Sequence, residues 1–410
     1  MPALPHSLRS LRHRDLQLFF SGQAISLVGT WMQSVAEGWL VYRLWSDATL
    51  LGWLSFLRQI PVFFLSAWAG GLADRMPRRK LVLATQFSAM VQAGALAWVT
   101  LAGHPTKFQL LGLAAALGVV NAFDIPSRQA YLVDMAGPDL ENAIAFNSTL
   151  VNGTRVLGPA IAGYIVTAIG EGLCFFANSV SYVFVIVGLY FTRAGPPATS
   201  KRSRGGLVEG VRYAWNAHHA RWPLLLVTCA SLMAMPYVTL MPVFAKTIFH
   251  GNAATQGHLL GSAGVGAFLG AVSLLRRGPG KGLAHRVAWG ASLLAAGLIG
   301  LSLAPNEWVA YGALVVTGFG FMSQMASTNT LLQSLAPVDM RGRVMGLYSM
   351  AFIGMGPFGS LLLGYAAAHV GARVAVGVGA ATYLLASLVF RTVTEGIELA
   401  AQQARAERVA

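Results

Sequence analysis

The chain of 410 residues is too apolar for a soluble protein, because 55% of its residues are hydrophobic and only 11% are charged. Soluble domains carry about 25% charged residues. Apolar segments of about 20 residues, long enough to cross a hydrocarbon layer as helices, recur along the whole sequence. Since lipid admits only helices and closed barrels, the sequence predicts an all-α membrane protein with twelve transmembrane helices, which begin near Leu18, Leu51, Leu81, Leu110, Ala143, Leu173, Leu224, Leu259, Val287, Val309, Val344 and Val374.

The net charge of +14 comes from a one-sided distribution of basic residues. Of the 29 Lys and Arg residues, 23 fall in the termini and alternate loops on one side, and two, Arg58 and Arg155, fall inside predicted helices. The opposite side has four, which are Arg43, Lys107, Lys246 and Arg373. Positive loops stay in the cytoplasm. We therefore expect both termini in the cytoplasm and no nucleic-acid partner.

The first predicted helix carries a polar stripe. Spacings of three and four residues place five polar side chains on one face, namely Gln23, Ser26, Thr30, Gln33 and Glu37. Unpaired polar groups are costly in hydrocarbon, so the stripe must face a watery path or another helix. The sequence leaves both alternatives open, a lining of the transport pathway and hydrogen bonding between helices.

Two charged residues lie inside the first two predicted helices. Glu37 and Arg58 stand ten and eleven residues either side of Asp47, the middle of the short outer loop. Antiparallel neighbours would bring them to a similar depth. Charged side chains within spans indicate function, so Glu37 is a candidate proton carrier that alternates between a proton and Arg58. A static ion pair is the alternative.

The loop between the second and third helices gives the most specific signal. Its sequence GGLADRMPRRK, residues 70–80, closely resembles the signature loop between helices 2 and 3 of the major facilitator superfamily of secondary transporters. Pro77 stands where that signature usually has a second glycine. The resemblance implies two pseudo-symmetric six-helix bundles, the major facilitator fold, which alternate access to a central site.

The same resemblance implies a conformational latch, in which Asp74 sits against the start of helix 11. A simple cluster of topology-setting charges is the alternative. The predicted latch residues are Gly70, Asp74, Arg75, Arg78, Arg79, Asp124, Arg128 and Arg341.

Helix 4 carries Asn121, Asp124 and Arg128 at spacings of three and four, and Pro126 is expected to interrupt the helix near the cytoplasmic face. The motif resembles the end of helix 4 in a bacterial exporter subgroup of the superfamily, the one with the macrolide efflux and enterobactin export proteins. That resemblance implies the bacterial inner membrane. The arginine motif near the start of helix 4, found in many proton-coupled members, is missing here.

Helix 5 and its repeat supply two predicted helix-break motifs. Gly158-Pro159 recurs as Gly356-Pro357 after 198 residues. Asn152 and Arg155 share the face of Pro159, and this segment resembles the exporter motif of helix 5, with Thr154 in place of a glycine. Arg155 could attract an anionic substrate group, pair with a carboxylate or serve packing.

The repeat and the longest polar stretch define the expected domains. They are an N-terminal bundle, a cytoplasmic linker with a candidate interfacial helix around Val211, a C-terminal bundle and a cytoplasmic tail, with bounds 1–193, 194–221, 222–393 and 394–410. The C-terminal half offers only uncharged polar residues within its spans. The full set of predicted pathway residues is Gln23, Thr30, Gln33, Glu37, Arg58, Asn121, Asn152, Arg155, Gln324 and Thr328.

These features predict a secondary active transporter that exports small amphipathic molecules, such as drugs or siderophores, in exchange for protons. An importer or a lysophospholipid flippase on the same fold is the alternative. A membrane sensor or enzyme is a remote one, because the sequence has no catalytic constellation. We expect a monomer in a lipid bilayer, with a small-molecule substrate and protons as its partners. We expect no metal or cofactor, and no ATP-driven step, since a phosphate-cradling loop is missing.

Overall fold

The structure, a computed structural model, describes all residues except 1–11, 74, 193–216, 278–281, 338–339 and 410. Asp74 and the candidate interfacial helix around Val211 therefore lie outside the described residues. The described residues form helices and no strands, and the chain divides into two compact units. Unit 1 comprises Met1–Ser46, Trp53–Ser200 and His250–His258, and unit 2 comprises Asp47–Gly52, Lys201–Phe249 and Leu259–Ala410.

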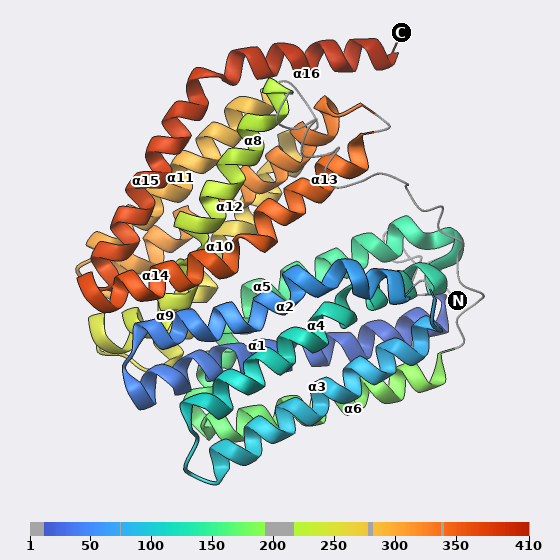
Figure 1. The fold of residues 1–410 in the computed structure, drawn as a ribbon, viewed down its shortest axis with the longest axis vertical. Coiled ribbons are helices and arrows are strands. Elements are labelled where there is room, and N and C mark those ends of the chain that lie inside the picture. The colour runs from blue at the N-terminus through green and yellow to red at the C-terminus, as the bar shows by residue number, and fades with distance from the viewer. Residues whose placement is uncertain (1–11, 74, 193–216, 278–281, 338–339, 410) are drawn as a thin grey trace. The chain divides into compact units, whose positions relative to one another are not determined.

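Unit 1 is built from long helices, coloured blue to green in Figure 1. They are α1 (Arg14–Trp45), α2 (Ala48–Ala73, which belongs to unit 1 from Trp53 on), α3 (Arg78–Leu101), α4 (Lys107–Ala136), the short η2 (Gly137–Asp139), α5 (Leu140–Ile169) and α6 (Glu171–Phe191). Helix α1 packs against α5 and α6, and α3 packs against α4 and α6. The turn after α1 is sharp because Ser46 adopts a left-handed conformation and the Asp47 carboxylate accepts a hydrogen bond from the Thr49 amide at 2.8 Å, which caps α2.

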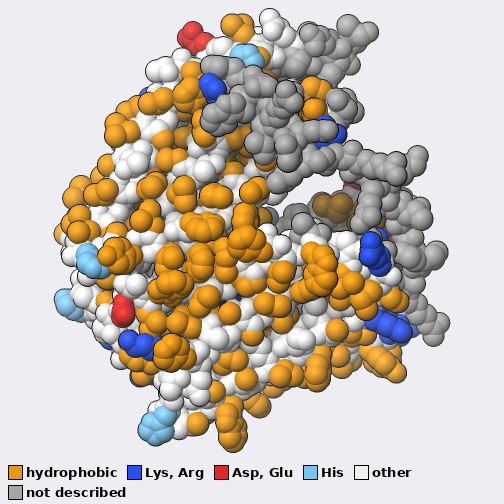
Figure 2. Space-filling view, in the orientation of Figure 1, with side chains coloured by type: hydrophobic (Ala, Val, Ile, Leu, Met, Phe, Trp, Pro, Cys, Tyr) orange, Lys and Arg blue, Asp and Glu red, His pale blue; other side chains and the backbone are white. Residues whose placement is uncertain are grey.

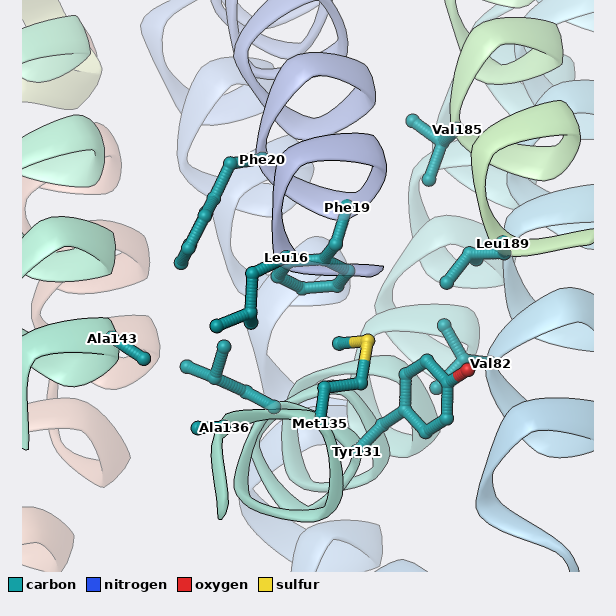
Figure 3. Close-up of a cluster of buried hydrophobic side chains, with 11 residues drawn as sticks. Leu16, Phe19, Phe20, Val82, Tyr131, Met135, Ala136, Ala143, Val185 and Leu189 are labelled. Atoms are coloured by element: carbon teal, nitrogen blue, oxygen red, sulfur yellow. The ribbon is translucent and has the colours of Figure 1, made fainter. Parts of the chain in front are cut away.

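An apolar cluster fills one end of unit 1, where α1, α3, α4 and α6 converge. Figure 3 shows Leu16 and Phe19 of α1 facing Met135 and Tyr131 of α4, with Leu189 of α6 beside them. All of these side chains are buried. The Tyr131 hydroxyl shares a hydrogen bond with Thr192, so its polar tip is satisfied inside the cluster.

Unit 2 has less regular helices. They are α8 (His218–Cys229), η3 (Ala230–Ala234), η4 (Met235–Leu240), α9 (Met241–Val243), η5 (Phe244–Ile248), α10 (Ala253–Arg277), α11 (Leu283–Leu303), α12 (Glu307–Leu335), α13 (Arg341–Ser349), η6 (Met350–Gly354), α14 (Gly356–Val370), α15 (Ala372–Thr392) and α16 (Thr394–Val409). Three of these segments, η3, η5 and η6, are π-helical. Pro236 and Pro242 lack the amide hydrogen that an α-helix needs, and the span from α8 to η5 changes its winding around them.

Within the part of the chain that the structure describes, twelve helical stretches have the length of membrane spans, and ten of them are also apolar enough to be recognised by composition. Helix α1 falls short because of its polar stripe, and α5 contributes the shorter apolar segment Leu157–Ile169 among the residues searched. The outward faces carry large hydrophobic side chains, such as Phe108, Trp98 and Trp308, which are 88%, 76% and 75% exposed. Figure 2 shows a face on which hydrophobic side chains predominate and charged ones are few. Such surfaces suit a multi-pass membrane protein.

Two predicted helix interruptions are absent from unit 1. Helix α4 runs through Pro126 to Ala136, so the prediction that this proline interrupts it was wrong. Helix α5 runs through Gly158 and Pro159 without a break. A Cβ atom on Gly158 would lie 2.5 Å from the indole of Trp31, so this glycine allows close packing of α5 on α1. In unit 2, by contrast, the π-helix η6 ends at Gly354 and α14 begins at Gly356.

The C-terminal tail is a packed helix of unit 2, α16, drawn in red in Figure 1. Ile397 and Ala401 are buried against the rest of the unit. The Glu398 carboxylate accepts hydrogen bonds from the amides of Gly282 and Ala284 at 2.6 and 3.1 Å. It therefore caps the first turn of α11, where a negative charge is favourable.

Candidate functional site

The polar stripe of α1 faces other helices of unit 1. Gln33 is its best-connected member, because it donates to Gln92 of α3 at 3.1 Å and accepts from Asn178 of α6 at 2.6 Å. One turn earlier in the stripe, Thr30 donates to the Ser26 carbonyl. Gln33 thus bonds to two other helices, whereas the Thr30 bond lies within α1.

Glu37 and Arg58 lie together, so the prediction that they share a depth is confirmed. The Arg58 Nη1 atom is 3.3 Å from the Glu37 Oε2 atom and also donates to the Ser34 hydroxyl at 3.3 Å. Glu37 is fully buried, and its Oε1 atom has no partner among the described residues. The carboxylate is thus held by a single long bond to one guanidinium nitrogen.

A glycine brings Arg58 to this place. A Cβ atom on Gly118 of α4 would lie 2.6 Å from the Arg58 carbonyl oxygen, so only glycine allows α4 to approach α2 this closely. The contact fixes the α2 backbone at the residue whose side chain reaches Glu37.

Ser26, Thr30 and Gln33 of the stripe also border a chamber inside unit 1, together with Arg58. The chamber encloses about 80 Å³. Its wall comes from α1, α2, α3, α4 and α6, and consists of Ser26, Leu27, Thr30, Gln33, Arg58, Gln86, Ala89, Leu117, Val120, Asn121, Asp124, Arg128, Asn178 and Tyr182. Ionisable side chains within membrane spans are rare and indicate function. This polar space is therefore the candidate functional site.

Asp124 is a well-paired carboxyl group in the chamber wall. Its Oδ1 atom accepts from Thr85 at 2.8 Å and from Gln86 at 2.7 Å, and its Oδ2 atom lies 3.4 Å from the Arg128 Nε atom. Two hydrogen bonds and one ion pair thus hold this carboxylate. Asp124 therefore contrasts with Glu37, which has one donor group.

The basic residues after α2 bind the ends of α4 and α6. Arg78 donates to the Asp134 carboxylate at 2.6 Å, and the two side chains are 9% and 4% exposed. Arg79 donates to the carbonyl oxygens of Leu189, at 3.0 Å, and Tyr190. These bonds tie the start of α3 to two neighbouring helices.

The predicted latch stays a prediction, because Asp74 lies outside the described residues. Arg75 is exposed, and nothing lies within 4 Å of a Cβ atom on Gly70. Asp124 and Arg128, which were assigned to the latch, line the chamber. Arg341 is the first residue of α13, in unit 2.

The remaining predicted pathway residues do not line the chamber. Asn152 and Arg155 are exposed on α5. Gln324 and Thr328 are fully buried in α12 of unit 2. The Gln324 Oε1 atom accepts from the Tyr383 hydroxyl at 2.5 Å, while its Nε2 atom and the Thr328 hydroxyl have no partner among the described residues.

Half of the residues that line the chamber were not predicted from the sequence. The missed polar side chains of the wall are Gln86 on α3 and Asn178 and Tyr182 on α6. Gln92 was missed as a partner of Gln33, and Asp134 as the partner of Arg78. The signal was present, since Asn178, Ser181 and Tyr182 repeat the helical spacing that marked α1. It was weaker there because no charged residue accompanies it.

The family model described as Transmembrane secretion effector, a family of the major facilitator superfamily, matches residues 6–407. The chain belongs to this family. Curated relatives include the staphyloferrin A transporter of Staphylococcus aureus, which is 26% identical over 354 residues and covers 84% of this chain and 87% of the relative. The multidrug efflux pump Tap of Mycobacterium tuberculosis is 24% identical, with 83% and 84% covered. The enterobactin exporter EntS of Shigella boydii is 25% identical, with 86% and 85% covered.

Solved structures share the fold of this family member. The nucleoside transporter NupG gives a TM-score of 0.71 at 13% identity, covering 92% of this chain and 98% of that chain. A bacterial homologue of the iron transporter ferroportin gives 0.69 at 18% identity, with 93% and 98% covered. The major facilitator fold, with twelve transmembrane helices in two pseudo-symmetric bundles, is thus confirmed for this membrane transporter.

Proposed function

We propose that this chain is a proton-coupled exporter of small amphipathic molecules in a bacterial inner membrane. It works as a monomer with both termini in the cytoplasm, and its two six-helix bundles, residues 1–193 and 222–393, alternate access to the substrate. Residues 194–221 link the bundles and residues 394–410 form the tail.

The observation that carries the proposal is the environment of Glu37. An ionised carboxylate away from water is costly unless its charge is well paired. Glu37 is fully buried, its one charged partner is 3.3 Å away, and one carboxylate oxygen has no partner among the described residues. A proton on Glu37 would replace this partial pairing, and Arg58 would then be released. This arrangement suits a carboxyl group that gains and loses a proton in each transport cycle.

The direction and the substrate class rest on the relatives. One is named an efflux pump for many drugs, one an exporter of enterobactin and one a transporter of staphyloferrin A. Their names favour export of drugs or siderophores by this chain. A drop in the intracellular level of such a compound on expression supports export, and a rise contradicts it.

The coupling is tested in everted membrane vesicles with an imposed pH gradient. The probe is the compound that most strongly raises the melting temperature of the purified protein in a screen of drugs, siderophores and lysophospholipids. We expect Glu37→Gln to abolish accumulation of the probe against its gradient and to leave its downhill exchange intact. Unchanged uphill accumulation by Glu37→Gln contradicts the proposal.

A further inference from the structure

Glu37 is fully buried, so a proton carrier at this position needs a route to water. Gln33, one helical turn earlier on α1, lines the chamber, and so does Arg58, the partner of Glu37. We infer that the chamber of unit 1 holds water and is the path by which protons reach Glu37. This inference rests on the proposed function, because it supplies the proton that the transport cycle uses.

The chamber has the size and the lining of a hydrated space. A single water needs roughly 10–15 Å³, whereas the chamber offers about 80 Å³. Ten of its 14 lining residues are polar or charged. Cavities that stay dry are apolar, and buried waters need two to four polar partners. This wall therefore favours several waters over an empty space.

The two guanidinium groups in the wall have donors left over. Arg58 bonds to protein through its Nη1 atom alone, and Arg128 contacts Asp124 through its Nε atom alone, among the residues that the structure describes. Their side chains are 21% and 31% exposed, so the remaining nitrogens are accessible. Water oxygens in the chamber would accept from these nitrogens and link them in a hydrogen-bonded chain.

The charges around the chamber favour a proton path over a metal cation. Arg58 from α2 and Arg128 from α4 repel a further cation, and Asp124 is already bound by Thr85, Gln86 and Arg128. Helices α3 and α6 contribute only uncharged side chains to the wall. Arg155 of α5, the other helix packed on α1, is exposed. A proton that moves by exchange of hydrogen bonds along water carries the same charge, but it needs no set of protein ligands in the chamber.

The first test needs only the wild-type protein. Hydroxyl radicals generated in the bound water of the full chain in lipid nanodiscs oxidise side chains that touch that water. Tyr182 lines the chamber, whereas Tyr383 occupies the equivalent place in unit 2 and is fully buried. We expect several-fold greater oxidation of Tyr182 than of Tyr383. Equal protection of both tyrosines would overturn the inference.

The second test fills the chamber. Ala89→Leu adds three carbon atoms to the wall, and Ala84→Leu makes the same change on an exposed face of the same helix. In the vesicle assay we expect Ala89→Leu to lose uphill accumulation while keeping downhill exchange, and Ala84→Leu to match the wild type. Should Glu37→Gln lose uphill accumulation while Ala89→Leu keeps it, the water path is refuted and the proposed function stands. Should Glu37→Gln keep it, the proposed function itself fails.

Discussion

The fourth helix of each half carries charges in unit 1 and neutral groups in unit 2 at the same positions. Asp124 and Arg128 of α4 correspond, 200 residues later, to Gln324 and Thr328 of α12. Tyr182 of α6 corresponds to Tyr383 of α15 after 201 residues.

In unit 1 this set surrounds a chamber, whereas in unit 2 it packs closely and leaves the Gln324 and Thr328 groups partly unpaired. The repeat therefore keeps these positions on the fourth helix but places charged side chains at them in unit 1 and uncharged ones in unit 2. The uncharged counterpart in unit 2 lies on the continuous helices α12 and α15.

The largest effect is expected when only one member of the charged pair in unit 1 is replaced by its unit 2 counterpart. Arg128→Thr alone leaves Asp124 without its charged partner, and loss of a buried partner costs about 3–5 kcal/mol. The loss here is smaller, since Arg128 is 31% exposed. The double variant Asp124→Gln with Arg128→Thr should recover much of it. Denaturation of the purified variants measures this, and a double variant less stable than the single one would break the comparison.

Removing the two interhelical hydrogen bonds of Gln33 should have the next largest effect. Gln33→Leu leaves the Asn178 amide and the Gln92 carbonyl oxygen without their partner, at about 1–3 kcal/mol for each buried group. Gln324→Leu is the matched change in unit 2, where only the Tyr383 hydroxyl loses a partner. We expect a larger drop in melting temperature for Gln33→Leu. A larger drop for Gln324→Leu would show that unit 2 depends more on its polar groups.

Two glycines at equivalent positions allow an effect on helix packing to be distinguished from an effect on proton coupling. Gly118 touches the Arg58 carbonyl in unit 1, and Gly318, 200 residues later, touches the Ala263 carbonyl in unit 2. Alanine at either place should destabilise by about 1–3 kcal/mol through overpacking. Only Gly118→Ala should also weaken uphill accumulation in vesicles, because it displaces Arg58 from Glu37. Equal transport losses in the two variants would contradict the separate roles of the units.

The smallest effect is expected at Tyr383. Tyr383→Phe removes the hydroxyl that bonds to Gln324, which should lower stability by about 0.5–1.5 kcal/mol. Uphill accumulation should match the wild type, since this residue lies outside the chamber. A transport defect as large as that of Glu37→Gln would assign proton handling to unit 2 as well.

The sequence predicts the parts of this site that local spacing determines. The distances of Glu37 and Arg58 from Asp47 were enough to pair them, and helical periodicity found the stripe on α1. The bond from Asn178 to Gln33 spans 145 positions and depends on how α6 packs against α1, which no local pattern contains. The predicted helix break at Gly158-Pro159 is absent for a related reason. Gly158 packs against Trp31 of α1, and α5 continues through both residues.

The most direct test of the account is the infrared difference spectrum of the purified full chain between alkaline and acidic pH. We predict a band from a newly protonated buried carboxyl group that is present in the wild type, retained in Asp124→Asn and lost in Glu37→Gln. A band that survives in Glu37→Gln, or one that is lost in Asp124→Asn alone, would contradict the assignment of Glu37 as the proton carrier.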